Sequence, residues 1–245
     1  MAGFSVAIVN PRQVRAFANA KGQLGKTDAL DARLLADFVQ SVKPRESQPV
    51  TEEQHAFQDL LSRRRQLLLT QTAEKNRLKS ASCEAVQASL QRHIAWINQE
   101  LDDIDRQLDE RVKQSELWRA KDDLLQGVPG VGKNLSYSLI GRLPELGQLK
   151  RQRIAALVGV APYPKDSGQT YGPRHIRGGR RDVRCALYMA TLAAVRWNPV
   201  IRKHYHKLIE AGKPPKVALT ACMRKLLTIL NSMMKHHTSW NKALC

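Results

Sequence analysis

The feature that most constrains the fold is the stretch from Thr51 to Lys121, which contains neither glycine nor proline. Both residues interrupt long helices, so their absence favours helix throughout this stretch. In its second part, apolar residues recur at alternating spacings of four and three, the period of a coiled-coil seam. A bend between about Ser80 and Gln87 would give two antiparallel helices, whose work we interpret as spacing and self-association. The seam residues are Leu90, Ile94, Ile97, Leu101, Ile104 and Leu108.

Positive charge is concentrated in the second half of the chain. Residues 127–245 contain 21 Lys and Arg against four acidic residues, a net charge of +17, whereas the first 126 residues are nearly neutral. A one-sided charge of this size predicts a polyanionic partner, most often nucleic acid. Membrane-surface binding is the alternative. Because the sequence shows no long hydrophobic span and no signal peptide, we expect no membrane partner.

The four cysteines are scattered along the chain and form no C-x-x-C pair. Disulfides and a zinc site are therefore not expected, and this cysteine usage is typical of a protein in the reducing cytoplasm. The cysteines are Cys83, Cys185, Cys222 and Cys245.

A segment rich in glycine, proline and arginine spans residues 158–184 and holds one serine, Ser167. Its composition excludes a long regular element, so we expect a shaped loop. The arginines, with His175 among them, could surround an anion with hydrogen-bond donors, and a hydroxyl beside them could attack a phosphate. Alternatively, the loop only binds nucleic acid and its serine caps a turn. The arginines are Arg174, Arg177, Arg180, Arg181 and Arg184.

Residues 124–147 resemble a helix-hairpin-helix motif. Its Gly-Val-Pro-Gly-Val-Gly turn would place backbone N–H groups at the start of the following helix, where they can hold a DNA phosphate without reading the base sequence. We therefore expect Gly130, Gly132 and Lys133 to contact DNA.

The chain closes with a predicted helix over residues 216–234, preceded by Gly212-Lys-Pro-Pro. We interpret its apolar residues as core rather than as a ligand site. His236 and His237 follow it without other metal-ligating side chains nearby, so no metal is assigned to them. The apolar residues are Val217, Leu226, Leu227, Leu230 and Met234.

The first 42 residues predict one strand followed by helices. The apolar run from Phe4 to Val9 is typical of a buried strand. Asp28 and Asp31 stand three residues apart on a predicted helix, so both carboxylates leave one face and could share a Mg²⁺ ion. Alternatively, they are ordinary solvent-exposed residues that the helix dipole favours. A lone strand has no pairing partner, so we do not expect residues 1–25 to form a stable domain.

The order of these segments resembles one family of mobile-element enzymes. NPRQVRAFANAKGQLGKTDALDARLLADF, the coiled coil, VPGVG, APYPKDSGQTYG and GGRRDVRCALYMA follow one another along the chain. They are similar to the transposases of the insertion-sequence family numbered one hundred and ten, the bridge-RNA-guided DEDD/serine recombinases. The likeness spans nearly the whole chain.

The resemblance implies a RuvC-like N-terminal domain in which four acidic residues hold Mg²⁺, with Asp28 and Asp31 as the third and fourth. It implies that Ser167 is the nucleophile that joins covalently to DNA. It further implies a structured guide RNA as a partner, and oligomers in which the two domains meet across subunits. The strands that carry the first Asp and the Glu have no counterpart in this sequence. We therefore expect a truncated copy or a misplaced start, and no catalysis by this chain alone.

Taken together, the sequence predicts a mainly α protein in three parts. These are a remnant of a RuvC-like α/β domain (1–42), a linker with an antiparallel coiled coil (43–121) and a helical transposase domain with the helix-hairpin-helix (122–240). The expected function is the cutting and joining of DNA through Ser167 with Mg²⁺ assistance. The alternative is a non-catalytic remnant that binds DNA or RNA and dimerises through its coiled coil. A helix-hairpin-helix repair accessory protein is a third interpretation, but such a protein has no use for the Ser167 loop.

Overall fold

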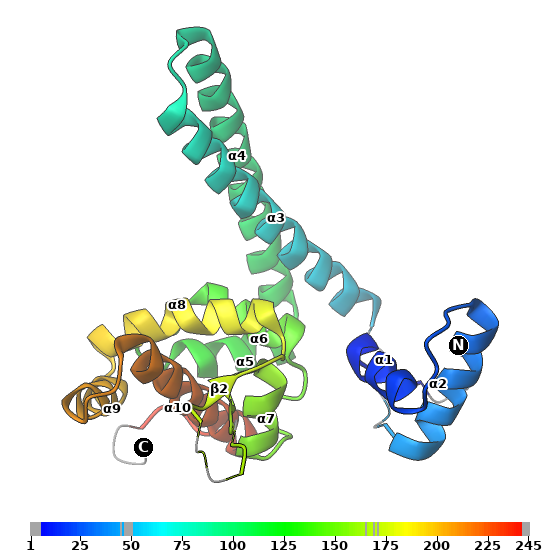
Figure 1. Ribbon diagram of the computed structural model, residues 1–245. Helices are drawn as coiled ribbons and strands as arrows, with labels where there is room; N and C mark the ends of the chain where they lie inside the picture. The colour runs from blue at the N-terminus through cyan, green and yellow to red at the C-terminus, as the bar shows by residue number, and fades with distance from the viewer. Residues whose placement is uncertain are drawn as a thin grey trace. The chain divides into compact units, whose positions relative to one another are not determined.

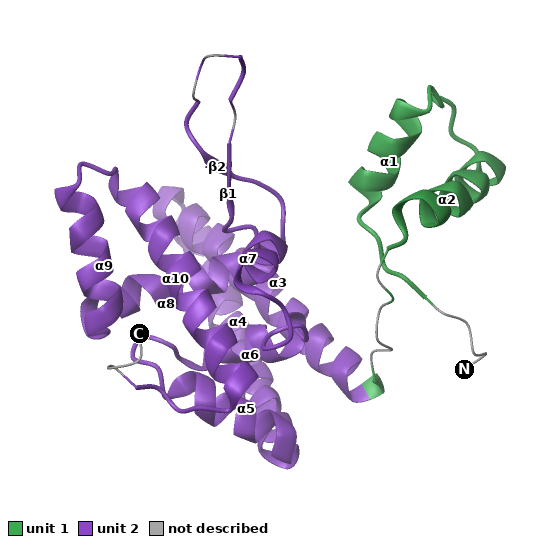
Figure 2. Ribbon diagram, turned by 90° about the horizontal axis from the view of Figure 1, so that it is seen from below, with its two compact units in different colours: residues 1–52 green, residues 53–245 purple. Residues whose placement is uncertain are grey.

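The computed structural model describes residues 6–44, 46, 51–164, 166–168, 170 and 172–241. Most of them are helical, and the strands within these ranges form a single two-stranded ribbon (Figure 1). The mainly α fold class predicted from the sequence is confirmed. The chain divides into two compact units, unit 1 (residues 1–52) and unit 2 (residues 53–245), shown in Figure 2.

The helices and strands carry the labels of Figure 1 and begin and end at defined residues. In chain order they are α1 (Pro11–Ala20), α2 (Asp28–Val42), α3 (Glu52–Ser80), α4 (Glu84–Gln114), α5 (Glu116–Gln126), α6 (Lys133–Arg142), α7 (Arg151–Val158), β1 (Pro162–Tyr163), β2 (His175–Ile176), α8 (Arg181–Trp197), α9 (Pro199–Glu210) and α10 (Pro215–His236).

Unit 1 is a pair of packed helices with a small core. Asn10 caps α1 by accepting a hydrogen bond from the Arg12 backbone N–H, and Thr27 caps α2 in the same way. The rings of Phe17 and Phe38 meet edge to face, with centroids 5.5 Å apart. The buried side chains of these two helices are Ala18, Leu34 and Phe38.

The strand predicted over Phe4–Val9 is wrong in the part that the structure describes. Residues 6–9 adopt no regular structure, and the Val6 and Ile8 side chains are 59% and 77% exposed. A strand is stable only when a neighbouring strand completes its hydrogen bonds, and the described residues of unit 1 contain none. Phe4 and Ser5 lie outside the described residues.

In unit 2, α3 and α4 form a long antiparallel hairpin, and the predicted bend is confirmed because α3 ends at Ser80 and α4 begins at Glu84. Hydrogen bonds between side chains show that the two helices run antiparallel, since residues later in α3 pair with residues earlier in α4. Arg64 donates to Asp105 at 2.5 Å, and Gln71 donates to Asn98 at 2.5 Å. Of the seam residues, Leu90 and Ile94 near the tip are half-buried, whereas Ile97, Leu101, Ile104 and Leu108 are buried.

The start of α3 belongs to the helical core of unit 2. Phe57 is fully buried, and its ring lies 4.8 Å from the Trp118 ring of α5. The Gln58 side chain donates to the backbone carbonyl of Gly141 in α6 at 2.7 Å. A Cβ at Gly141 would lie 2.8 Å from the Phe57 ring, so this glycine lets the two helices pack closely. The first turns of α3 therefore pack directly against the core helices α5 and α6.

Helix α10 lies in the core of unit 2. Leu226, Leu227 and Leu230 are fully buried, and Met234 is 7% exposed, which confirms that these residues are core. Val217, interpreted as core from the sequence, is 53% exposed. By length and composition α10 could cross a membrane, but 56% of its most apolar window is buried inside the unit. Packing therefore accounts for the apolar character of this helix.

Candidate nucleic-acid interface

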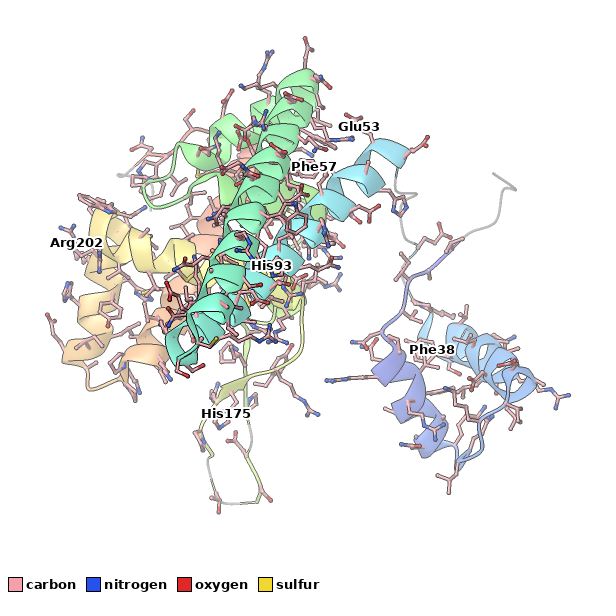
Figure 3. The ribbon with its side chains drawn as sticks, turned by 90° about the horizontal axis from the view of Figure 1, so that it is seen from above. Phe38, Glu53, Phe57, His93, His175 and Arg202 are labelled. Atoms are coloured by element: carbon pink, nitrogen blue, oxygen red, sulfur yellow. The ribbon has the colours of Figure 1, made fainter. Side chains whose placement is uncertain are left out.

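Ser167 lies at the tip of a short antiparallel ribbon, here called the arm (residues 162–176). At its base, Pro162 pairs with Ile176 and Tyr163 with His175. At its tip, Ser167 and Thr170 exchange two backbone hydrogen bonds of 3.1 and 3.0 Å. Figure 2 shows the arm projecting away from the helices of unit 2, and Figure 3 marks its base by the labelled His175. The composition of this segment therefore predicted its loop character correctly.

The Ser167 side chain is exposed, and among the described residues none forms a hydrogen bond with its hydroxyl. The turn at the tip is held instead by backbone groups and by Asp166, whose carboxylate accepts from the Gly172 N–H at 3.2 Å. Among the described residues, the serine side chain therefore forms no turn cap. The hydroxyl is positioned to meet a ligand from solution.

The two ends of the segment that carries the arm meet at paired glycines. Gly159 and Gly179 both have positive φ, of 80° and 75°. A Cβ on Gly159 would lie 2.2 Å from the Gly178 carbonyl oxygen, and one on Gly179 would lie 2.2 Å from the Gly159 nitrogen. The Arg180 N–H also donates to the Leu157 carbonyl at 2.9 Å. Only glycine fits both positions, because any side chain would separate the two backbones.

The five arginines predicted to bind DNA fall into two groups. Arg180 forms a bidentate ion pair with Glu145, at 2.5 and 2.6 Å, and donates to the Arg142 carbonyl. Arg184 donates to the carbonyls of Gly178 and Val158. These two guanidinium groups therefore tie the ends of the segment to the fold, and their contact with DNA stays a prediction.

The remaining three arginines face solvent. Arg174, Arg177 and Arg181 are exposed, and the described part of the chain offers none of them an ion pair. Guanidinium groups without a protein partner keep all five donors for a phosphate. The arrangement supports anion contact along the arm and at its base.

The predicted helix-hairpin-helix turn lies between α5 and α6. Gly132 is the exposed N-cap residue of α6 and has no side chain to cap the helix, so backbone N–H groups of the first turn remain available. Lys133 is exposed, but its ammonium group pairs with Asp109 of α4, which also accepts from the Tyr137 hydroxyl at 2.6 Å. Burial opposes ionisation of Asp109, but the hydrogen bonds from Lys133 and Tyr137 outweigh it and lower its pKa.

Gly130, in the same turn, has a packing role. Its φ is +95°, and a Cβ there would lie 2.5 Å from backbone atoms of Ala194 in α8. Nearby, the Asn198 side chain donates to the Pro129 carbonyl at 3.3 Å. The turn is thereby fixed against α8, and contact of Gly130 with DNA stays a prediction.

We expect Gly130→Ala to destabilise the protein by about 2–5 kcal/mol, because a left-handed φ costs about 1–2 kcal/mol and an overpacked contact about 1–3 kcal/mol. Gly132→Ala is the matched control, since its φ is −113° and nothing lies within 4 Å of the place that its new Cβ would occupy. Denaturant unfolding of the two variants measures the difference. Equal midpoints would contradict the packing role.

Asp28 and Asp31 lie where the sequence places them, in the first turn of α2. Asp28 is exposed and Asp31 is half-buried. Within the ranges that the structure describes, no group of three or more His, Cys, Asp or Glu side chains could hold a metal ion. Magnesium is commonly bound through one or two carboxylates together with water and substrate phosphates, so this pair fits part of such a site.

A basic groove lies beside the arm and was not found from the sequence. It encloses about 640 Å³ between α7, the base of the arm, α9 and α10, and no carboxylate of the described residues lines it. The signal that was missed is a stripe on α10 at four-residue intervals, formed by Lys216, Thr220, Arg224 and Thr228. The charged and titratable residues of the basic groove are Arg151, Arg174, His175, His204, Lys216, Arg224 and Lys225.

Two family models match the chain. One, described as the transposase IS116/IS110/IS902 family, matches residues 122–206. The other is described as a transposase, of the DEDD type named for IS110, and matches residues 1–81. The first range contains the arm with Ser167, and the second contains Asp28 and Asp31.

Curated relatives agree with these matches. Pilin gene-inverting proteins of Moraxella bovis and Moraxella lacunata are each 26% identical over 243 residues, which cover 98% of this chain and 75% of each relative. An uncharacterized 42 kDa protein of insertion element IS900 from Mycobacterium paratuberculosis is 27% identical over 162 residues, or 64% of this chain and 39% of that protein. With both family models and relatives along its length, the chain belongs to the IS116/IS110/IS902 family of transposases.

Proposed function

We propose that this transposase cuts and joins DNA by strand transfer, with Ser167 as the nucleophile. The observation that carries the proposal is the exposed Ser167 hydroxyl at the tip of an arm that also carries the solvent-facing Arg174. The two Moraxella relatives are named for inverting a pilin gene, which is a rearrangement of DNA. A nucleophile on a projecting arm is suited to a substrate as large as a duplex.

The proposed reaction is an exchange of phosphodiester bonds. The Ser167 oxygen forms a bond to a DNA phosphorus atom while the bond from phosphorus to one deoxyribose oxygen breaks. The serine proton is lost and the leaving sugar oxygen gains a proton, so no oxidant or energy source is needed. Attack by another strand's hydroxyl on the serine–phosphorus linkage reverses the step and joins new ends. Arginines at the phosphate would offset the charge that develops as the bonds change.

We further propose that Asp28 and Asp31 hold Mg²⁺. When bound, the ion makes a phosphate more electrophilic and lowers the pKa of a nearby hydroxyl. In this chain, the hydrogen bond from the Leu30 N–H to the Thr27 hydroxyl, at 3.3 Å, fixes the first turn of α2, from which both carboxylates extend. The DEDD character of the matching family model supports divalent metal use.

The proposed partners are DNA, a structured guide RNA and further copies of the chain, met in the cytoplasm. Exposed apolar side chains on the α3–α4 hairpin, such as Leu69 at 60% and Trp96 at 46%, support self-association through it.

The proposed functional division is a RuvC-like part (1–42), a linker with coiled coil (43–121) and a transposase part (122–240). A second candidate is a non-catalytic DNA- or RNA-binding protein, which the charge of residues 127–245 favours equally; the serine–DNA adduct separates the two.

The affinity of the full chain for duplex DNA should fall steeply with salt concentration. Residues 127–245 carry a net charge of +17, so many Lys and Arg side chains are available to contact phosphates. Six or more phosphate contacts would cost about a thousand-fold in affinity between about 50 and 200 mM salt. Fluorescence anisotropy over that range measures the slope, with a neutral-backbone analogue of the same sequence as the control. A shallow slope, or equal binding of the neutral analogue, would rule out backbone contact as the source of affinity.

A further inference from the structure

We propose that the basic groove is a positioning site for the phosphodiester backbone of the nucleic-acid strand that is presented to Ser167. The inference rests on the proposed function of Ser167 and adds the surface that seats the substrate. It assigns a role to Lys216, Arg224 and Lys225 of α10, which lie outside the arm and outside the helix-hairpin-helix turn.

The first argument is that the cations of the basic groove have no anionic partners among the described residues. Elsewhere in unit 2, arginines such as Arg64, Arg142 and Arg180 are paired with carboxylates at close range. In contrast, none of the five Lys and Arg side chains of the groove forms an ion pair with any described residue. Like charges gathered in one concavity repel each other, and a bound polyanion removes that repulsion.

His204 lies in the same positive field, on the wall of the groove. Its pKa is lowered, first by burial and then by the positive charges of Lys225 and Lys207. The imidazole therefore meets cations from α10 as well as from its own helix. Because His204 is half-buried, the positive potential extends into the groove and is not confined to its rim.

The second argument is the composition of the walls. Val160, Ile176 and Val217 line the groove together with the cationic side chains. An apolar wall displaces water, so attraction between the cations and a phosphate is screened less than on an open surface. The sugar between two phosphates offers a matching apolar surface. The lining therefore fits a phosphodiester backbone better than it fits an isolated inorganic anion.

The third argument is reach. Pro162 and Ile176 line the groove and also pair with each other at the base of the arm. Ser167 follows Pro162 by five residues, so an extended chain places it at most about 18 Å away. That span corresponds to roughly five base-pair steps of 3.4 Å along a duplex. A strand held in the groove would thus bring a phosphate only a few nucleotides away to the Ser167 hydroxyl.

The test uses the full chain carrying Ser167→Ala, so that binding is measured without covalent capture. The groove variant combines Lys216→Gln, Arg224→Gln and Lys225→Gln. The control combines Arg63→Gln, Arg92→Gln and Arg119→Gln, which removes the same charge from exposed side chains of α3, α4 and α5. The probes are a fluorescent DNA duplex and an RNA duplex of the same sequence, each titrated at several salt concentrations.

We expect the groove variant to bind the DNA probe about 30-fold more weakly at 100 mM salt, with a salt slope reduced by about 2.7, the value for three phosphate contacts. The control variant should stay within about threefold and keep its slope. A loss for the DNA probe supports the proposal, because DNA is the strand that is presented to Ser167. A loss confined to the RNA probe would overturn it. Equal losses in the groove and control variants would overturn the proposal, since net charge alone would then explain them.

Thermal unfolding of each variant shows whether it folds. If the triple variant does not, the pair Arg151→Gln and Lys216→Gln, both on exposed side chains, replaces it with an expected slope change of about 1.8. The proposal is distinguishable from the nucleophile assignment. In a background with Ser167 intact, the groove variant should still form an adduct at saturating DNA if Ser167 is the nucleophile. Loss of groove-dependent binding and loss of the adduct are thus separate results.

Discussion

Replacement of Ser167 by alanine should abolish the covalent protein–DNA adduct and leave DNA affinity within about fivefold. The adduct requires the serine oxygen, because alanine offers no atom that can bond to phosphorus. Affinity should persist because a neutral hydroxyl contributes about 1 kcal/mol or less to a contact dominated by many cations. Because Ser167 is exposed at the arm tip, the change should leave folding intact.

The measurement is a denaturing gel of protein incubated with labelled DNA and Mg²⁺. We propose that Asp28 and Asp31 are two of four acidic ligands, so the assay mixture also contains a domain that carries the first Asp and the Glu, supplied in cis or in trans. Thr170→Ala is the matched control: it removes the hydroxyl of the residue opposite Ser167, while the backbone hydrogen bonds between the two remain. An adduct that persists in Ser167→Ala, or that Thr170→Ala removes just as completely, would refute the nucleophile assignment.

Asp28→Asn and Asp31→Asn should each lower the adduct yield by about a hundred-fold or more, because a metal that polarises a phosphate supplies several kcal/mol of transition-state stabilisation. Asparagine keeps the size of the side chain and removes the charge that a hard cation requires. DNA affinity should change little, since neither residue contributes positive charge. Both changes leave the Thr27 cap of α2 in place.

The control for this pair lies on the same helix. Asp37 is a half-buried carboxylate of α2 that forms an ion pair with Lys21 at 2.5 Å, and Asp37→Asn should leave the adduct yield unchanged. Dependence of the yield on Mg²⁺ concentration provides a second readout, which should shift for Asp28→Asn and Asp31→Asn only. If all three variants gave wild-type yields, the two aspartates would be ordinary residues of a first helical turn.

The parts of the fold that the sequence predicted are those set by local pattern. The apolar repeat through Ile97 and Leu108 requires a partner helix, and the stretch without glycine or proline supplies one in the same chain. The density of glycine and proline around Ser167 likewise excluded a helix there. The acidic pair on α2 followed from the helical period alone.

The parts that the sequence did not predict depend on distant neighbours. Val6 and Ile8 have strand-like composition, but a strand also needs a paired edge. Arg180 resembles its neighbours in the sequence, and only the position of Glu145, 35 residues earlier, turns it into a structural residue. The stripe through Lys216 and Arg224 was overlooked because the opposite, apolar face of the same helix dominates its composition.

The glycine pair that closes the segment carrying the arm has a consequence for how this protein can change. Because Gly159 and Gly179 fix where the chain leaves and re-enters the helical unit, the connection over residues 163–175 can be lengthened, shortened or exchanged without moving the core, to which the buried Val160 belongs. The entropic cost of a longer connection is small, about 0.6 kcal/mol for each doubling of its length. The arm can therefore be replaced as one segment, and different tip sequences can be inserted while the helical unit stays the same.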